Sequence, residues 1–313
     1  MRHLLQAFAG LLLLAGASSG LARECVSVVA AGGGYGFWGQ VKAGAEQAGR
    51  DLNIDVYFRG PNDEADSTVQ IKFIDAFLEK HCRVFVIAPA SPQVAQRVNE
   101  LKRRGIATVY IDRDMPGSDV AGIVSTDNFK AGQLAGQMMA LELNGKGKVA
   151  VLRLKKGIPS TDQREAGFIE SAKSAGLDVV VDQYIGSGVG EARANAARIL
   201  GQLRVPVDGV FTPNESTTYG VISALQDLGR KARIVHIGFD LNDFFRQSLQ
   251  TGGLYGVVVQ RPFEIGYTGV TMAYRVMNGE KPDNKNIDTG VSFVTRKTFE
   301  QTGASGPLPL IRP

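Results

Sequence analysis

The sequence predicts an α/β protein made of two doubly wound parallel-sheet lobes. Short apolar runs alternate with amphipathic segments along most of the chain, as expected for strands joined by helical crossovers. The strand-like runs form two successive sets of about five, and two such sheets are more usual than one of twice that size. The length of 313 residues also suits two domains.

The first set of elements precedes Asn128. Its strands are predicted where aliphatic and β-branched residues run together and end at turn residues, over residues 26–31, 54–58, 84–88, 108–111 and 121–125. Helices are predicted where apolar residues recur at helical spacing, over residues 38–52, 67–78 and 92–101. Pro92 suits the first turn of the third helix, because that turn leaves backbone N–H groups without partners.

The same alternation restarts at Asn128. Strands are predicted over residues 149–152, 179–181, 210–212, 234–238 and 254–259. Helices are predicted over residues 128–141, 163–175, 191–203, 218–228 and 262–277, with a short helix from Asp243. Residues 303–313 have neither pattern, and we expect them to be loosely ordered.

Residues 1–22 have the parts of a secretory signal peptide. A basic start at Arg2 precedes an apolar stretch over residues 4–17, and small residues stand at Gly20 and Ala22, the two positions that a signal peptidase reads. The apolar stretch is shorter than the ~20 residues that a membrane-spanning helix needs. The sequence therefore predicts cleavage after Ala22 and export of a soluble protein.

Cys25 directly precedes one predicted strand, and Cys82 stands two residues before the start of another. An even number of cysteines in an exported protein suggests a disulfide. If the two strands are neighbours in the sheet, their starting ends lie side by side and the cysteines can be bridged. Two buried free thiols are the alternative. A metal site or a redox role is disfavoured, because the chain has no C-x-x-C motif and only three histidines.

The charge of the chain gives no sign of a nucleic-acid partner. It has 35 basic and 31 acidic residues, and this small excess is not clustered. We therefore expect no nucleic acid among its partners.

The glycines after the first strand do not form a nucleotide-binding loop. Where a G-x-G-x-x-G loop needs a small residue, this chain has Phe37 and Trp38, and the second strand does not end in an acidic residue. We therefore expect no nucleotide cofactor. Two adjacent aromatic side chains at a helix start suit stacking on the C–H face of a sugar ring. Trp38 is also in phase with Val41 and Ala45, so a place in the core is the alternative for it.

Polar residues that follow the predicted strands are candidate binding residues, because ligands of doubly wound sheets bind at the carboxyl ends of the strands. Six of them have side chains that can hydrogen-bond to hydroxyl groups: Asp112, Arg113, Arg164, Asn214, Asp240 and Gln260. Arg164 is predicted at the start of helix 163–175. For each residue the alternative is a helix cap or a surface group, but their convergence on one edge favours a site.

Several short motifs, taken in order, resemble the periplasmic sugar-binding proteins of the ribose-binding type, which have the type I periplasmic binding protein fold. The resemblance covers residues 26–294. It rests on eight motifs: Gly36-Phe37-Trp38, Lys42-x-Gly44-Ala45, Ile111-Asp112-Arg113, Thr126-Asp127-Asn128, Arg164-Glu165-x-Gly167-Phe168, Phe211-x-x-Asn214-Glu215, Ile237-Gly238-Phe239-Asp240 and Gln260-x-Pro262-x-x-Ile265-Gly266. Each motif alone is weak, but eight in order are specific.

The resemblance implies two lobes joined by a three-strand hinge, with crossings near 126–127, 260 and 288–290. The N-terminal lobe would be residues 23–126 plus 261–288, and the C-terminal lobe residues 127–260 plus 289–313. In the family the paired aromatics stack on the sugar and the polar residues bind its hydroxyls, and these roles match the aromatic and polar candidates named above. The family also implies a periplasmic monomer that works with an ABC permease in the inner membrane.

Two departures from the family pattern concern the identity of the ligand. Tyr35 stands where ribose binders have an Asn, and we include it among the candidate ligand-binding residues. Ser187 stands where they have an aromatic residue, so that stacking wall would have to be rebuilt, for example from Tyr184. These differences leave room for a larger or differently shaped sugar than ribose.

The leading functional hypothesis is a periplasmic solute-binding protein that captures a pentose or hexose between its lobes and delivers it to an ABC importer. The alternative is a periplasmic sensor that presents a small solute to a membrane receptor or kinase. An enzyme is disfavoured, because the chain has no G-x-S-x-G motif and no metal-ligand spacing, and His81 and His236 are isolated. A transcription regulator is excluded, because a signal peptide stands where DNA-binding helices would have to precede Val26.

Overall fold

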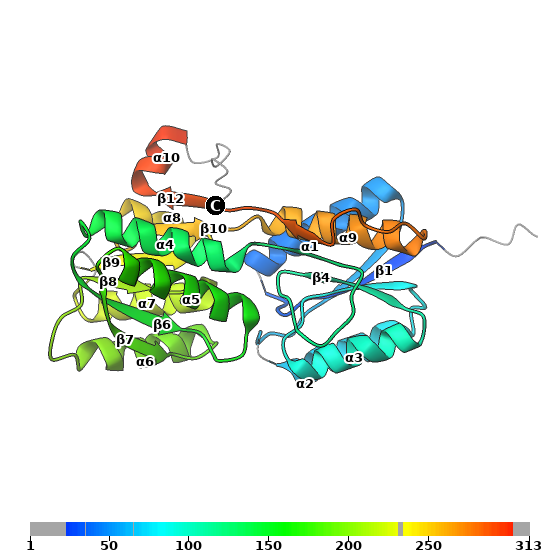
Figure 1. Ribbon diagram of the computed structural model, residues 1–313, viewed down its shortest axis with the longest axis horizontal. Coiled ribbons are helices and arrows are strands. Elements are labelled where there is room, and N and C mark those ends of the chain that lie inside the picture. Colours follow the sequence, from blue (N-terminus) through cyan, green and yellow to red (C-terminus); the bar gives the residue numbers. More distant parts are fainter. Residues whose placement is uncertain (1–22, 35, 65, 231–233, 303–313) are drawn as a thin grey trace, which may run out of the picture.

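The computed structural model describes residues 23–34, 36–64, 66–230 and 234–302, which form two α/β lobes side by side (Figure 1). The predicted signal peptide, Tyr35 and residues 303–313 lie outside this described part. Each lobe has one six-stranded sheet. The predicted fold class is therefore confirmed, with one more strand in each sheet than the apolar runs indicated.

Lobe 1 has the strand order β2-β1-β3-β4-β5-β11, with parallel pairing between neighbours. Its strands are β1 (Cys25–Val29), β2 (Asp55–Arg59), β3 (Val84–Ile87), β4 (Ala107–Ile111), β5 (Gly122–Ser125) and β11 (Asn286–Asp288). Helices α1 (Phe37–Leu52) and α9 (Pro262–Met277) cover one face, and α2 (Ser67–Leu78) and α3 (Pro92–Arg103) cover the other. Val28 packs toward the first pair and Val29 toward the second, because successive strand residues face opposite sides.

Lobe 2 repeats this arrangement in the order β7-β6-β8-β9-β10-β12, with the edge strand β12 antiparallel to β10. Its strands are β6 (Lys148–Arg153), β7 (Asp178–Tyr184), β8 (Gly209–Phe211), β9 (Val235–Phe239), β10 (Gly256–Val259) and β12 (Ser292–Thr295). Its helices are α4 (Asn128–Glu142), α5 (Pro159–Ser174), α6 (Val189–Gly201), α7 (Glu215–Asp227), α8 (Asp243–Gln250) and α10 (Arg296–Thr302). Helices α4 and α5 cover one face, and α6 and α7 cover the other.

The chain passes between the lobes three times. It leaves lobe 1 after β5 and enters lobe 2 at α4, returns between β10 and α9, and crosses again between β11 and β12. The connecting segments are residues 126–127, 260–261 and 289–291. Each lobe is therefore built from separate stretches of the chain.

Two parts of the element prediction need correction. Strands β11 and β12 and helix α10 were not predicted, since such short segments carry too few residues for a periodic pattern. Helix α5 begins at Pro159 and not at residue 163, because proline in the first turn is compatible with the helix and its fixed φ favours it. Arg164 consequently lies in the second turn of α5 and not at its start.

Cys25 and Cys82 form a disulfide, as predicted, and the described residues contain no free cysteine. Strands β1 and β3 are parallel neighbours, with Val26 opposite Val84, so the residues before them are brought together. The Cα atoms of the two cysteines are 5.1 Å apart. The cross-link ties the amino ends of two central strands of lobe 1, at the edge of the sheet away from the carboxyl ends.

Close helix packing on lobe 2 depends on two glycines. A Cβ atom on Gly132 of α4 would lie 2.0 Å from the carbonyl oxygen of Arg164, and one on Gly167 of α5 would lie 2.1 Å from that of Phe129. Only glycine allows two backbones to approach so closely. This contact sets the position of the turn of α5 that carries Arg164.

Candidate functional site

The predicted binding residues come together at the facing carboxyl edges of the two sheets. One small cavity there is lined by residues of both lobes: Phe37, Trp38, Glu64, Asp112, Arg113, Ser160, Thr161, Arg164, Asn214, Glu215, Asp240 and Gln260. Eight of these were predicted from the sequence, and the ninth candidate, Tyr35, lies outside the described residues. The cavity has a volume of about 20 Å³, which is room for about one water molecule. We call it the central cavity.

Asp112 and Arg113 form the lobe 1 side of the central cavity. Both follow β4 directly and are buried. Arg113 Nε donates to Asp112 Oδ2 at 3.1 Å, and Arg113 Nη2 forms an ion pair with Glu64. Its remaining nitrogen, Nη1, is buried and has no hydrogen-bond partner among the described residues. An arginine held on two sides with one unpaired donor is suited to binding a hydroxyl group or a carboxylate.

Phe37 and Trp38 lie at the start of α1 with their rings edge to face, at 86° and 5.0 Å between centroids. Trp38 Nε1 donates to Glu64 Oε1 at 2.8 Å. Trp38 also packs in the core of lobe 1. It is therefore both a core residue and part of the cavity wall. Glu64 therefore links the aromatic wall to Arg113.

Arg164, on the lobe 2 side, donates hydrogen bonds from all three of its guanidinium nitrogens. Its Nε donates to Asn128 Oδ1 at 2.8 Å, Nη1 to the carbonyl of Pro213 at 2.9 Å and Nη2 to Gln260 Oε1 at 2.6 Å. The guanidinium lies 4.5 Å from the centre of the Phe239 ring. These contacts fix the planar group in one orientation.

Gln260 joins Arg164 to Asp240. While its Oε1 accepts from Arg164, its Nε2 donates to Asp240 Oδ1 at 2.8 Å. Thr126 Oγ1, from another crossing segment, also donates to Gln260 Oε1 at 3.1 Å. The side chain of Gln260 thus connects two of the three crossings with the binding residues of lobe 2.

Asp112 and Asp240 occupy equivalent places in the two lobes. Each follows a central parallel strand, and each has a left-handed backbone, with φ of 63° and 69°. Burial raises the pKa of Asp240 to about 7, against the opposing effect of Arg164. Burial likewise raises the pKa of Asp112, against the effect of Arg113. Since the Asp240 carboxyl takes up a proton near neutral pH, it can accept or donate a hydrogen bond there.

Asn214 has the role of a helix cap. Its Oδ1 accepts from the backbone N–H of Thr217 at 3.2 Å, and its own backbone N–H donates to Thr217 Oγ1 at 3.4 Å, which completes a capping box at the start of α7. The helix-cap alternative is therefore correct for Asn214, although its side chain also lines the central cavity. A cap fixes the side chain, so that it is preorganised for a ligand.

Four lining residues were not predicted: Glu64, Ser160, Thr161 and Glu215. Glu64 lies in the connection after β2, where no periodicity indicates a direction for its side chain. Ser160 and Thr161 fell outside the predicted helix, since α5 was expected to begin later. Glu215 follows Asn214 in one of the eight family motifs. This position is the one feature of the sequence that could have indicated Glu215 as a lining residue.

Tyr184 does not rebuild the missing aromatic wall. It lies at the end of the edge strand β7, is 45% exposed, and does not line the central cavity. Its ring packs against the guanidinium of Arg153 at 5.6 Å. Ser187 donates to Asp63 Oδ1 at 3.2 Å and so forms a contact between the lobes outside the cavity.

The described ranges of the chain contain no group of three or more His, Cys, Asp or Glu side chains placed to hold a metal ion. No helix among them is long and apolar enough to cross a membrane.

Comparison with known proteins agrees with the fold. Residues 26–281 match the model of a periplasmic binding protein domain. The ribose import binding protein of Haemophilus influenzae is 25% identical over 277 residues, which cover 88% of this chain and 93% of that protein.

Two solved structures are also similar. The periplasmic component of an ABC-type sugar transport system from Hahella chejuensis is 32% identical with a TM-score of 0.83, over 87% of this chain and 99% of that one. An ABC transporter solute-binding protein from Agrobacterium vitis with bound D-fucose is 26% identical with a TM-score of 0.84, over 91% and 100%. These relatives are binding proteins and not enzymes. The chain therefore belongs to the periplasmic binding protein family and is related to its ribose-binding type.

Proposed function

We propose that this protein captures a monosaccharide, a pentose or a hexose, between its lobes and delivers it to the permease of an ABC importer. The observation that carries the proposal is the convergence of buried polar side chains from both lobes on the central cavity, at facing strand ends. The D-fucose bound to the relative from Agrobacterium vitis supports a sugar as the ligand class. The sensor alternative has no support among the relatives described above.

In this function Arg113 and Arg164 donate hydrogen bonds to the sugar, and Asp112 and Asp240 accept them. Asn214 and Gln260 can do both. Phe37 and Trp38 supply an apolar surface for the C–H face of the ring. Tyr35 is a further ligand-binding residue in this proposal.

Entry of a sugar requires the lobes to move apart, because the central cavity has room for about one water molecule. The lobes that move are residues 23–126 plus 261–288 and residues 127–260 plus 289–313, with the three crossings as the hinge. Binding then favours closure of the lobes around the ligand, since only closure brings donors and acceptors of both lobes onto one ligand. The permease would recognise the closed shape.

We also propose that the protein acts in the periplasm as a monomer, after removal of residues 1–22 by cleavage behind Ala22. Mass spectrometry of the exported protein tests the cleavage site, and light scattering tests the oligomeric state.

A panel of pentoses, hexoses and polyols, screened by thermal shift and followed by calorimetry, tests the function. At least one monosaccharide is expected to raise the melting temperature. Asp240→Ala is expected to abolish its binding, because arginine and hydroxyl groups are then left unpaired. Asp75→Ala, which removes an exposed ion pair of lobe 1, is the control. Absence of any sugar response in the unmodified protein would contradict the proposal.

A further inference from the structure

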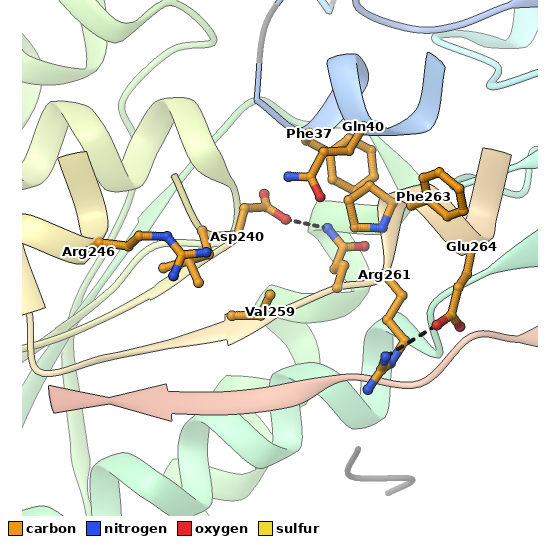
Figure 2. Close-up of a pocket in the computed structure, with 11 residues that line it drawn as sticks. Phe37, Gln40, Asp240, Arg246, Val259, Arg261, Phe263 and Glu264 are labelled. Carbon is orange, nitrogen blue, oxygen red and sulfur yellow. Dashed lines mark hydrogen bonds and ion pairs between the residues drawn. The ribbon is translucent and has the colours of Figure 1, made fainter. Parts of the chain in front are cut away.

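A second and larger cavity adjoins the central one (Figure 2). Its volume is about 250 Å³, against about 20 Å³ for the central cavity. The two share three lining residues, Phe37, Asp240 and Gln260, so they are adjacent. We call the larger cavity the annex, and define it by the walls that it does not share: Gln40, Leu241, Arg246, Val259, Arg261, Pro262, Phe263 and Glu264.

Both lobes contribute to the annex. Gln40 comes from the first turn of α1 and Phe263 from the first turn of α9, on the lobe 1 side. Leu241 and Arg246 come from the end of β9 and from α8, on the lobe 2 side. In Figure 2, Gln40 and Arg246 approach the cavity from different sides. A molecule in the annex would therefore contact both lobes, as one in the central cavity would.

Phe263 gives the annex an exposed aromatic surface. Its side chain is 44% exposed, which is unusual for a large apolar residue in the described part of this chain. The ring is inclined by only 14° to that of Tyr267, one helical turn further along α9, at 6.3 Å between centroids. Tyr267 thus supports the ring from one side. An exposed aromatic ring beside a polar cavity is a surface on which a sugar ring can stack.

The remaining groups also favour a carbohydrate. Gln40 and Gln260 donate and accept, Arg246 donates, and Asp240 accepts, so that hydroxyl groups in several orientations find partners. Arg246 lies 5.2 Å from the centre of the Phe299 ring, a contact that limits its freedom. Charges of both signs line the annex, which disfavours a simple anion or cation. The polar side chains among its walls, which an acyl chain would leave without partners, disfavour an acyl chain.

The volumes indicate that a ligand uses both cavities. Small-molecule sites in proteins usually measure about 300–1,000 Å³. The central cavity alone is far below this range, whereas the central cavity and the annex together come close to its lower end.

We propose that the annex is a second saccharide subsite, so that the site takes a glycoside whose terminal sugar occupies the central cavity after the lobes have moved apart to widen it. The second unit, a sugar or another flat group linked through the glycosidic oxygen, rests on Phe263 and hydrogen-bonds to Gln40 and Arg246. This inference rests on the proposed function. It extends that function from single sugars to sugars with a substituent.

Calorimetry with matched ligands tests the annex. The monosaccharide that binds best in the panel is compared with its own disaccharides and its phenyl glycoside. We expect at least one extended ligand to bind more tightly than the monosaccharide. Phe263→Ala should weaken the extended ligand by about fivefold to tenfold and the monosaccharide by less than twofold. If the alanine variant folds poorly, Phe263→Leu replaces it. This variant keeps apolar bulk but loses the flat ring, and it should give the same pattern.

Tyr184→Ala is the matched control, because Tyr184 is an aromatic residue of similar exposure that lines neither cavity. It should change the affinity for neither ligand. If every extended ligand binds more weakly than the monosaccharide, or if Phe263→Ala affects both ligands alike, the annex proposal is wrong while the proposed function stands. If no sugar of either kind binds, both are wrong.

Discussion

The backbone N–H of Phe37 in lobe 1 donates a hydrogen bond of 3.2 Å to Glu215 Oε2 in lobe 2. Phe37 is the first residue of α1, whose N-cap, Gly36, provides no side-chain cap, and the first turn of α1 has no acidic residue. Asn242 holds the other oxygen of Glu215 at 2.7 Å. The start of a helix in one lobe is therefore capped by a carboxylate of the other. This contact exists only when the lobes are together.

Glu215→Ala is expected to weaken sugar binding by about tenfold, because closure then leaves the start of α1 without its cap, a loss of ~1–2 kcal/mol. Calorimetry gives the affinity, and small-angle scattering gives the fraction of closed molecules. Emission from Trp38, the single tryptophan of the chain, reports on the same region. Asp227→Asn is the control, since it removes an exposed ion pair at the other end of α7. Unchanged affinity and scattering would contradict a role of Glu215 in closure.

Gly132→Ala is expected to weaken sugar binding although Gly132 does not line the central cavity. A Cβ atom there would meet the backbone of Arg164 at 2.0 Å, so α5 must shift and take the Arg164 guanidinium with it. We expect a loss of affinity of at least about tenfold and a lower melting temperature. Gly190→Ala in α6 is the matched control, because its Cβ would have no neighbour within 4 Å. Normal affinity of a folded Gly132→Ala protein would contradict the expected displacement.

His236 makes lobe 2 sensitive to acid. It is fully buried on β9, its Nε2 lies 2.8 Å from Thr212 Oγ1, and burial lowers its pKa to about 3. The pKa of His236 is lower in the folded protein than in the unfolded one. Its neutral form therefore contributes to the free energy of unfolding above pH ~6.5, and this contribution is lost as the pH falls toward 3. Between pH 7 and pH 5 this loss amounts to about 2 kcal/mol.

Urea unfolding at these two pH values, compared with His236→Asn, measures the effect. Asp240 and Glu165, whose pKa values burial raises to about 7, act in the opposite direction. Their contribution to the free energy of unfolding falls as the pH rises from about 4 to about 7, in the unmodified protein and in His236→Asn alike. The difference between the two proteins therefore isolates His236. Equal pH dependence would show that its protonation is not linked to folding.

Reduction of the Cys25–Cys82 disulfide is expected to destabilise lobe 1 by about 4 kcal/mol in the chain-entropy model, for a sequence separation of 57. Thermal unfolding with and without dithiothreitol measures this. The Cys25→Ser/Cys82→Ser double variant should unfold, with or without dithiothreitol, at the melting temperature of the reduced protein. Sugar affinity should stay the same, because the cross-link is at the opposite edge of the sheet from the site. A melting temperature that does not depend on reductant would contradict the stabilising role.

Much of the fold could be predicted because the central strands are buried on both faces. The run Val84–Ile87 is continuously apolar, and its limits agree with the prediction to about a residue. The residues directly after these strands, such as Asp112 and Asp240, could be found by position alone. The prediction failed where a side chain is placed by contacts far along the chain, as Glu64 is by Trp38 and Arg113. It also failed for β11, whose three residues pair only because β5 presents an open edge.

The three crossings also affect the order in which the protein can fold. Helix α9 supplies Ile265, Val270 and Met272 to the core that β1 and α1 begin, and β11 closes the edge of the sheet beside β5. The N-terminal lobe therefore cannot finish its core until nearly the whole chain has been synthesised. By contrast, the stretch from Asn128 to Val259 holds most of lobe 2 without interruption. We expect this stretch to collapse first, and the first hundred residues to remain a partly open sheet that the late-synthesised helix completes.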